Sequence, residues 1–508
     1  MKARVALNLL SGLLLSVLII SCEKTEIPPV DPPTEVPVEK PDLVFYALTS
    51  GAKLSKFNAK DPENAISSVQ ISGTLSAEII QAIDFRPATG QLYGIGSSSR
   101  IYVINPATGV AREIGTGPFT PALPATIVAF DFNPTVDRIR VVTGTGMNLR
   151  VNPETGAVAA TDGVVGSAAM VSAVAYTNNM AGAATTTLYD IDVKTQKLFK
   201  QDPPNNGTLV EVGSLQLNIS NEEGGFDIAP NGIALGVYPV DGKSTLFQVD
   251  LTTGKATALG NLGSTNNYNA IAIPTNPVAY AVDEDNALHI FNPENFTGTV
   301  SKPITGLQSS EMILGIDFRP ANGQLFALGS SNRIYTINVA TGAAAVVGSE
   351  LTTPLAGTSF GFDFNPTVDR IRVVSNTGQN LRIVPTTAAI AATDGNLNPG
   401  TPAVSAAAYT NNFAGATTTM LFDIDSQTDK LYRQDPPNAG TLVEIGNLGI
   451  DVESANGFDI GGVSGKAWAI LKTGAMNKIY SINISTGLAT PMMEFPKTVR
   501  GFAVGLGF

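Results

Sequence analysis

The sequence predicts an all-β protein, a β-propeller built from ten four-stranded, blade-like units in two repeats of about 233 residues each. Three observations predict this fold. Long segments occur twice, 232 or 233 positions apart. Each repeat divides into units that contain four short apolar segments separated by turns. No unit contains the apolar run with a 3.6-residue period that is typical of a helix.

The first 21 residues are predicted to be the signal peptide of a bacterial lipoprotein. A short basic start, MKAR, precedes an apolar run from Val5 to Ile20, which is too short and too near the terminus to favour a membrane span. The run leads into the residues Ile-Ile-Ser-Cys, which resemble a lipobox. We therefore expect cleavage before Cys22 and lipidation of that residue. An ordinary signal peptide with an incidental cysteine is the alternative.

Residues 22–41 are predicted to form an extended tether. Residues 23–41 hold six prolines and no apolar periodicity. At the rise of a polyproline helix, this segment would reach about 60 Å from a membrane. Lys24 stands where an aspartate would signal retention at the inner membrane. We therefore expect an outer-membrane lipoprotein of a Gram-negative bacterium, on either the periplasmic or the surface-exposed face.

Charge and cysteine content narrow the partners and the means of stabilisation. The formal net charge is −12, so nucleic acid is not an expected partner. Cys22 is the only cysteine, which rules out an internal disulfide. The core alone must therefore stabilise the fold, and the membrane is an expected partner only through the lipid anchor.

Two repeats, residues 42–274 and 277–508, fill the rest of the chain. The segment FDFNPTVDRIRVV is identical from Phe130 to Val142 and from Phe362 to Val374. Four further pairs lie 232 or 233 positions apart: IDFRP at Ile83 and Ile316, AYTNN at Ala175 and Ala408, QDPPN at Gln201 and Gln434, and GFDI at Gly225 and Gly457. The two repeats are therefore a duplication with almost no insertions.

Residues 82–115 illustrate one unit. The segments AIDF, LYGIG, RIYVIN and AREIG alternate with turns that contain Gly or Asn where a positive φ is expected. A turn close to Asn/Asp-x-x-Thr-Gly follows the third strand and marks ten units. It begins at Asn58, Asn105, Asn152, Asp192, Asp250, Asn292, Asn338, Val384, Asp425 and Asn483.

The repeats leave the number of rings open. The final segment RGFAVGLGF aligns with NAIAIP, which begins at Asn269, so we expect it to supply the inner strand that the first blade lacks. Only residues 274–277 separate AIAI from VAYAV. Four residues span about 14 Å, and three outer strands spaced about 4.8 Å apart would stand in the way of a chain leaving a closed ring. This favours one ten-bladed ring, with two five-bladed rings as the alternative.

The segments DFRPATGQLYGIG, FDFNPTVDRIRVV, NLRVNP, AYTNN and QDPPNNGTL, in this order, resemble the bacterial DUF4394 domain. Both repeats match throughout, from about residue 43 to 274 and from 277 to 505. The resemblance implies a propeller-like fold. It implies no activity, because the family is named for having no known function.

Histidine and cysteine chemistry is not expected. His289 is the only histidine and aligns with Ser55 in the first repeat, so a site shared by both repeats cannot depend on it. A histidine metal site is excluded on the same ground. Glycine-rich segments such as GSSSR and GTGTGMN lack a phosphate-binding pattern and are interpreted as turns.

Six aspartates stand at the same point of the first strand in their units, and that strand lines the axis of a propeller. They are Asp84, Asp131, Asp227, Asp317, Asp363 and Asp459. One interpretation is an acidic ring that binds a cation, for which calcium would be suited, or that acts as general acid and base. The other is that each carboxylate pairs with turn amides or with a nearby arginine, namely Arg86, Arg138, Arg140, Arg319, Arg370 or Arg372.

We name no catalytic residue. The candidate ligand-binding residues are Asp84, Asp131, Asn133, Asp137, Arg138, Arg140, Asn148 and Arg150 in the first repeat, and Asp317, Asp363, Asn365, Asp369, Arg370, Arg372, Asn380 and Arg382 in the second. Each has an expected partner within its own blade, while arginines near a channel mouth could also bind a carboxylate or a glycan.

Two functions remain. The first is a non-catalytic binding, adhesion or scaffold module on the cell envelope, with a glycan or a protein as its ligand. The alternative is a propeller enzyme, a hydrolase or lyase acting on a polysaccharide or lactone through carboxylates or bound calcium.

Overall fold

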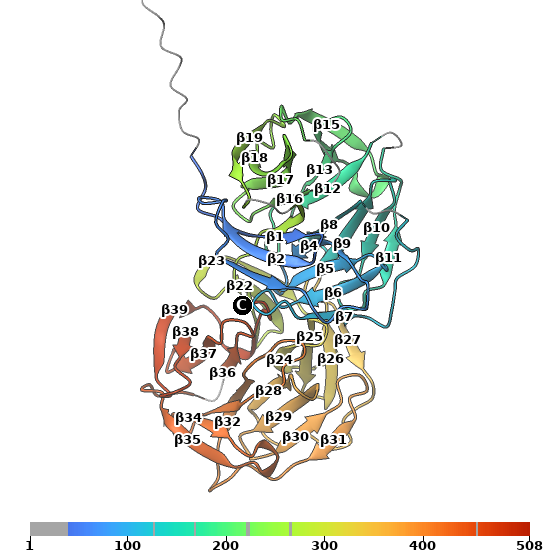
Figure 1. Ribbon diagram of the computed structural model, residues 1–508. Helices are drawn as coiled ribbons and strands as arrows, with labels where there is room; N and C mark the ends of the chain where they lie inside the picture. The colour runs from blue at the N-terminus through green and yellow to red at the C-terminus, as the bar shows by residue number, and fades with distance from the viewer. Residues whose placement is uncertain (1–38, 125–126, 167–168, 220–223, 264–266, 454–455) are drawn as a thin grey trace, which may run out of the picture. The chain divides into compact units, whose positions relative to one another are not determined.

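The computed structural model describes residues 39–124, 127–166, 169–219, 224–263, 267–453 and 456–508. Within these residues, forty strands form ten antiparallel sheets of four strands each (Figure 1). Residues 40–508 form one compact unit. The predicted signal peptide, Cys22 and nearly all of the predicted tether lie outside the described residues. No helix in the described segments is long and apolar enough to cross a membrane.

The first repeat forms five blades, and within each blade the strands run in order from the inner to the outer one. They are β20 (Tyr268–Ala272), β1 (Val44–Thr49), β2 (Lys53–Asn58), β3 (Ser67–Gln70); β4 (Ile80–Phe85), β5 (Leu92–Gly96), β6 (Arg100–Ile104), β7 (Ala111–Ile114); β8 (Val128–Asn133), β9 (Arg138–Thr143), β10 (Asn148–Val151), β11 (Val158–Thr161); β12 (Val171–Tyr176), β13 (Leu188–Asp192), β14 (Lys197–Gln201), β15 (Leu209–Ser214); and β16 (Gly225–Ile228), β17 (Ala234–Val240), β18 (Lys243–Val249), β19 (Ala256–Asn261).

The second repeat forms five more blades in the same order. They are β40 (Val499–Val504), β21 (Ala279–Asp283), β22 (Ala287–Asn292), β23 (Asn295–Pro303); β24 (Ile313–Arg319), β25 (Gln324–Gly329), β26 (Arg333–Ile337), β27 (Ala344–Val347); β28 (Phe360–Asn365), β29 (Arg370–Ser375), β30 (Asn380–Ile383), β31 (Ile390–Thr393); β32 (Val404–Tyr409), β33 (Leu421–Asp425), β34 (Lys430–Gln434), β35 (Leu442–Asn447); and β36 (Asn456–Ile460), β37 (Ala467–Thr473), β38 (Met476–Ile482), β39 (Ala489–Phe495). A short 3-10 turn follows β14 and β34, as η1 (Pro204–Asn206) and η2 (Pro437–Ala439).

The ten blades close into two five-bladed propellers, so the expectation of a single ten-bladed ring is wrong. The inner strands β20, β4, β8, β12 and β16 contact one another in one closed circle, and β40, β24, β28, β32 and β36 do so in a second. The expectation assumed that the chain must pass the outer strands of its own blade. Residues 273–278 instead lead directly from the end of β20, an inner strand of the first propeller, into β21, the second strand of a blade of the other propeller.

The C-terminal strand closes the second propeller and not the first, which corrects a further expectation. β40 pairs with β21, with Phe502 opposite Ala281. β20 completes the first blade by pairing with β1, with Ile271 opposite Ala47. Each repeat therefore supplies its own closing strand, which removes the exposed sheet edge from its inner ring. The sequence could not show which of the two strands completes the first blade, because β20 and β40 align with each other.

Neighbouring blades pack against each other through apolar side chains. Between the second and third blades, the rings of Tyr93 and Phe132 meet edge to face with their centroids 5.2 Å apart. Phe326 and Phe364 repeat this contact at 5.2 Å in the second propeller. Such aromatic pairs stabilise a core by about 1 kcal/mol beyond the area that they bury.

The recurrent Asn-x-x-Thr-Gly turn has the conformation that its residues favour. Asn105 Oδ1 accepts hydrogen bonds from the backbone N–H groups of Ala107 (2.9 Å) and Thr108 (3.1 Å). Gly109 has a φ of 76°, and a Cβ there would lie 2.2 Å from the carbonyl oxygen of Gln70 in the preceding blade. The glycine is therefore needed both for the turn and for the close approach of the neighbouring blade.

Candidate functional site

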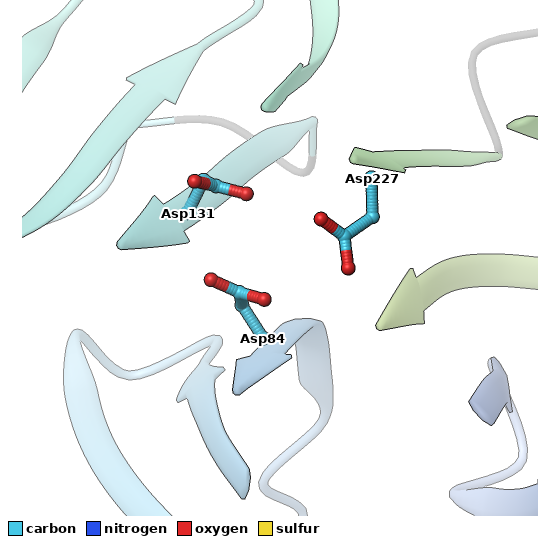
Figure 2. A group of neighbouring side chains, drawn as sticks. All are labelled: Asp84, Asp131 and Asp227. Carbon is cyan, nitrogen blue, oxygen red and sulfur yellow. The ribbon is translucent and has the colours of Figure 1, made fainter. Parts of the chain in front are cut away.

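One position of the inner strands faces the axis of each propeller and carries three aspartates and two alanines. In blade order the residues are Ala272, Asp84, Asp131, Ala175 and Asp227 in the first propeller, and Ala503, Asp317, Asp363, Ala408 and Asp459 in the second. Figure 2 shows the three carboxylates of the first propeller pointing toward one another. In each propeller, one carboxylate oxygen from each aspartate lies within 4.8 Å of the other two.

Each of these carboxylates links its blade to the next. Asp84 Oδ2 accepts a hydrogen bond from the backbone N–H of Phe132 (2.9 Å), and Asp131 Oδ1 accepts one from Tyr176 (3.1 Å). Asp227 Oδ2 accepts one from Ile273 and so closes the ring. The second propeller repeats all three bonds, from Asp317 to Phe364 (2.7 Å), from Asp363 to Tyr409 (3.1 Å) and from Asp459 to Val504 (2.6 Å).

The expected pairing of these aspartates with nearby arginines is wrong. No arginine contacts the channel carboxylates among the described residues, and backbone amides take that place. Two positions after Asp84, Arg86 already lies beyond the end of β4 and belongs to the turn, which directs it away from the axis. The alternative partners, backbone amides, are therefore the observed ones, although all of them except that of Ile273 come from strands and not from turns.

Burial raises the pKa of all six channel carboxyl groups, and the neighbouring aspartates raise the pKa of Asp84, Asp131, Asp317 and Asp363 further. The pKa of Asp227 and that of Asp459 rise to about 7. Three buried carboxylates at this spacing repel one another unless protons or a cation balance their charge. Oxygen ligands of this kind suit hard cations, so each cluster could hold a metal ion.

Small residues narrow the channel next to the carboxylates. Two positions earlier on the inner strands of the second propeller stand Gly315, Gly361, Ala406, Gly457 and Gly501. A Cβ on Gly315 would lie 2.6 Å from Cβ of Phe362 in the next blade, so the strands approach too closely for a larger residue. These residues border a cavity of about 10 Å³, roughly the room for one water molecule.

Arg140 of the repeated thirteen-residue segment is the centre of a buried network that spans two blades. Its Nε donates to Tyr176 Oη (3.2 Å), and its Nη2 donates to Asn205 Oδ1 (2.7 Å), both in the next blade. Its Nη1 donates to Asn148 Oδ1 (2.6 Å) and to Asp162 Oδ2 (2.7 Å) in its own blade. All three guanidinium nitrogens thus donate to protein groups. The expectation that the partners of Arg140 lie in its own blade is wrong for two of its four partners, Tyr176 and Asn205.

The second propeller repeats this network closely. Arg372 contacts Tyr409 (3.2 Å), Asn380 (2.6 Å), Asp394 (2.7 Å) and Asn438 (2.8 Å). The segments containing RIRVV, NLR, AYTNN and QDPPN therefore meet around one arginine in each repeat. Sequence reasoning placed the two arginines and Asn148 and Asn380 among the candidates, and it missed the other partners. The segment AATDG, identical at residues 159–163 and 391–395, was the signal that would have revealed the two aspartates.

The remaining candidates of the thirteen-residue segment support its turn. Asn133 Oδ1 accepts hydrogen bonds from the backbone N–H (3.0 Å) and Oγ1 (2.7 Å) of Thr135, and Asn365 does the same for Thr367. Arg138 donates to the carbonyl oxygen of Asp137 (2.8 Å), as Arg370 does to that of Asp369.

Arg150 and Arg382 lie on the next strand of the same blade. They bind Asp162 and Asp394, each with two hydrogen bonds of 2.8 and 2.9 Å. The bidentate geometry uses the planar guanidinium group of each arginine.

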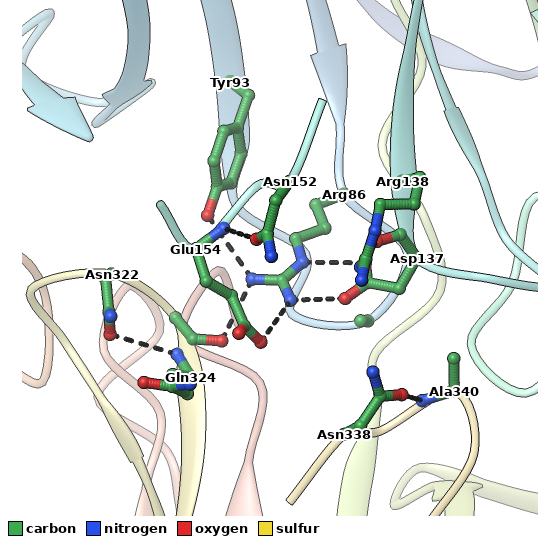
Figure 3. Close-up of polar contacts among 12 residues, drawn as sticks. Arg86, Tyr93, Asp137, Arg138, Asn152, Glu154, Asn322, Gln324, Asn338 and Ala340 are labelled. Atoms are coloured by element: carbon green, nitrogen blue, oxygen red, sulfur yellow. Dashed lines mark hydrogen bonds and ion pairs between the residues drawn. The ribbon is translucent and has the colours of Figure 1, made fainter. Parts of the chain in front are cut away.

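Arg86 connects the two propellers (Figure 3). Its fully buried guanidinium group donates to Asp137 Oδ1 (2.9 Å), to Glu154 Oε1 (3.3 Å) and to the carbonyl oxygen of Gly323 in the second propeller (3.0 Å). Asp137 reaches this position from a turn residue with a φ of 50°. Its carboxylate binds Arg86 of the second blade, so the expectation of a partner within its own blade is wrong for Asp137.

The equivalent arginine of the second propeller has fewer partners. Arg319 binds Asp369 (2.9 Å) and is part-buried. The residues that correspond to Tyr93 and Glu154 are Phe326 and Thr386, which cannot bind a guanidinium group in the same way. The larger set of partners around Arg86 therefore accompanies its contact with Gly323 of the second propeller, and Arg319 makes no equivalent set among the described residues.

Two further aspartates, Asp190 and Asp423, are fully buried on the second strand of the fourth blade. Neither of their carboxylate oxygens has a hydrogen-bond partner in the described part of the chain. Burial raises the pKa of Asp190 well above its usual value and that of Asp423 to about 8, while Arg140 and Arg372 act in the opposite direction. Asp423 in turn raises the pKa of Asp363 in the channel.

A pocket of about 450 Å³ opens between the third and fourth blades of the second propeller. Its walls come from the turn after β28, the end of β32, the loop before β33 and the end of β34. They are formed by Asn365, Thr367, Tyr409, Thr417, Thr418, Thr419, Met420, Leu421, Arg433, Gln434, Asp435 and Pro437. Of the sequence candidates, Asn365 lines this pocket, and its volume is within the range of small-molecule sites.

Solved structures with similarity to the chain are distant. The extracellular domain of a one-component system from B. thetaiotaomicron is 12% identical over 90% of this chain and 65% of its own, with a TM-score of 0.26. PorZ, a surface component of the type-IX secretion system of Porphyromonas gingivalis, is 13% identical over 90% and 58%, with a TM-score of 0.26. The dihydro-heme d1 dehydrogenase NirN is 13% identical over 81% and 74%, with a TM-score of 0.24. The chain thus spans less than two thirds of the first two structures.

Comparison of the sequence with curated proteins finds no match. The sequence profile of DUF4394, a domain of unknown function, matches residues 53–272 and again residues 287–503. These two regions coincide with the two propellers and cover most of the chain. The chain therefore belongs to the DUF4394 family, of which it contains two tandem copies.

Proposed function

We propose that this protein is a lipid-anchored module of the bacterial cell envelope that binds a ligand without changing it chemically. The observation that carries this proposal is the state of the six channel carboxylates. Each is 1% exposed and is hydrogen-bonded to the backbone of the next blade. Groups placed in this way stabilise the propeller and do not contact a substrate, whereas the pocket between the third and fourth blades opens to solvent.

The experiment that tests this function measures product release from a panel of polysaccharides and lactones. We expect none above background for the native protein. The enzyme alternative gains if products form and if the variant Asp131→Asn/Asp363→Asn, shown to be folded by circular dichroism, no longer releases them.

The proposed lipid anchor at Cys22 is inferred from the sequence alone. Lipidation at Cys22 and a tether over residues 22–41 would hold the propellers on the outer membrane, on its periplasmic or its outer face. Labelling of cells with a radioactive fatty acid tests this part. We expect label in the native protein and none in Cys22→Ala, which would then leave the membrane fraction.

Calcium is our proposal for the ion in the two carboxylate clusters, because its ligands are commonly carboxylate oxygens. Calorimetry on protein treated with EDTA should detect about two calcium ions per chain, and about one in Asp131→Asn. An absence of heat together with an unchanged melting temperature would exclude calcium.

A further inference from the structure

Two residues that line the pocket between the third and fourth blades of the second propeller, Arg433 and Gln434, each carry a buried polar atom that the described part of the protein does not satisfy. Gln434 lines the pocket and is 1% exposed, and its Oε1 has no hydrogen-bond partner in the described segments. Its Nε2 is engaged, because it donates to the carbonyl oxygen of Pro437. The side chain is thus held in place with its acceptor free.

Arg433 next to it offers a free donor. One of its terminal nitrogens, Nη2, binds Asp435 at 3.0 Å, while Nε is buried and has no partner among the described groups. An unsatisfied buried donor or acceptor destabilises a protein, so a ligand that reaches and satisfies both atoms would recover this free energy on binding.

The charges and the remaining wall define the chemistry of that ligand. The ion pair between Arg433 and Asp435 leaves the pocket without a net charge from these two groups. Asn365, Thr367 and the threonine run from Thr417 to Thr419 add amide and hydroxyl groups. A hydroxyl group can accept a hydrogen bond from Arg433 and donate one to Gln434.

We infer that this pocket binds a neutral, polyhydroxylated molecule, that is, a saccharide unit. A pocket of about 450 Å³ has room for a disaccharide. This inference rests on the proposed binding function and adds that the ligand is a neutral saccharide. An anionic ligand would have to displace Asp435 from Arg433, and a cationic ligand would have to displace Arg433 from Asp435. A neutral sugar can bind without breaking this ion pair.

The first propeller supplies a matched comparison. There Gln201 also has an unsatisfied Oε1, but Lys200 replaces Arg433 and lies 5.7 Å from the centre of the Tyr189 ring. Ala184 and Thr187 replace Thr417 and Met420. The lysine lacks the Nε–H that Arg433 offers, so the structure assigns the saccharide site to the second propeller.

Calorimetric titration of the full-length protein tests the inference, in a detergent without a sugar headgroup. The probes are maltose, cellobiose and lactose, with glucuronate as a charged comparison. We expect saturable binding of at least one neutral disaccharide at one site per chain. Affinity should fall at least tenfold in Arg433→Lys, which reproduces the residue of the first propeller. Lys200→Ala, the control in the first propeller, should bind as the native protein does.

Three results would overturn the inference. The first is that none of the three disaccharides binds. The second is that Arg433→Lys, with native circular dichroism and melting temperature, binds them as tightly as the native protein. The third is binding of glucuronate alone, with loss in Arg433→Lys. That last result would reject a neutral ligand and leave the binding function intact. Cleavage of a bound disaccharide would instead reject the non-catalytic function and leave the ligand class intact.

Discussion

Asp84 Oδ2 accepts a hydrogen bond from the backbone N–H of Phe132, 48 residues later in the sequence and one blade further around the ring. The same bond joins Asp317 to Phe364 in the second propeller. Together with the bonds made by the other channel aspartates, it fastens inner strands that are not neighbours in any sheet. The carboxylates that first suggested an active site therefore hold the blades in register with one another.

Arg140→Lys should destabilise the first propeller by about 2–4 kcal/mol, because a lysine cannot keep the contacts to Tyr176 and Asn205 across the blade boundary. Arg150→Lys is the matched control, since Arg150 binds the same Asp162 but is 33% exposed. It should lower the free energy of unfolding by less than about 1 kcal/mol. Guanidinium denaturation followed by circular dichroism measures both, and equal losses would argue against a buried network around Arg140.

Gly323→Ala should weaken the contact between the two propellers. A Cβ at this position would lie 2.8 Å from Arg86 Nη1 and 2.8 Å from Gln91 Oε1, in a residue whose φ is 66°. Gly232→Ala is the control, because Gly232 has a φ of 85° and a Cβ added to it would meet no atom within 4 Å. Both variants carry backbone strain of about 1 kcal/mol, and only the first adds the clash. We expect a melting temperature several degrees lower for Gly323→Ala, and equal melting of the two variants would count against the Arg86 link.

The raised pKa of Asp423 predicts a pH dependence of stability. Its pKa is about 3.8 in the unfolded chain and about 8 in the folded protein. Between these two pH values, the folded chain binds the Asp423 proton more tightly than the unfolded chain does. The stabilisation that Asp423 contributes is therefore complete below about pH 4 and is lost as the pH rises to about 8.

Asp423→Asn isolates this effect, because asparagine has nearly the same shape and does not ionise. In EDTA, the melting temperature of the variant should be close to the native value at pH 5 and about 5 °C higher at pH 8. Asp190→Asn should behave in the same way in the first propeller, since burial also raises the pKa of Asp190. A difference between variant and native protein that stays constant from pH 5 to pH 8 would show that Asp423 does not titrate in this range.

Local features of the fold could be predicted from the sequence because they depend on neighbouring residues. The turn at Asn105 is determined by the Asn side chain and by Gly109, so its position follows from the pattern alone. The strands of the second blade follow in the same way from their apolar segments between turns. The repeat also indicated ten blades, which the sheets confirm.

Contacts between blades could not be predicted in this way. The partner of Asp84 is the backbone N–H of Phe132, and every residue type except proline offers such a group, so no sequence signal marks it. Arg140 has a partner in Asn205, 65 positions away, and only the closed ring brings the two together. Ring closure itself was missed because β20 and β40 have similar sequences and either could complete the first blade.

The most direct test of the claim that the repeated carboxylates build the propellers is the melting temperature of Asp131→Ala/Asp363→Ala beside Asp131→Asn/Asp363→Asn, both in EDTA. Alanine leaves the buried N–H groups of Tyr176 and Tyr409 without an acceptor, at a cost of about 1–3 kcal/mol in each propeller. Asparagine keeps an acceptor oxygen at the same place. We expect the alanine variant to melt about 5 °C below the native protein and the asparagine variant to melt much closer to it. Native-like melting of the alanine variant would show that these carboxylates do not hold the blades together.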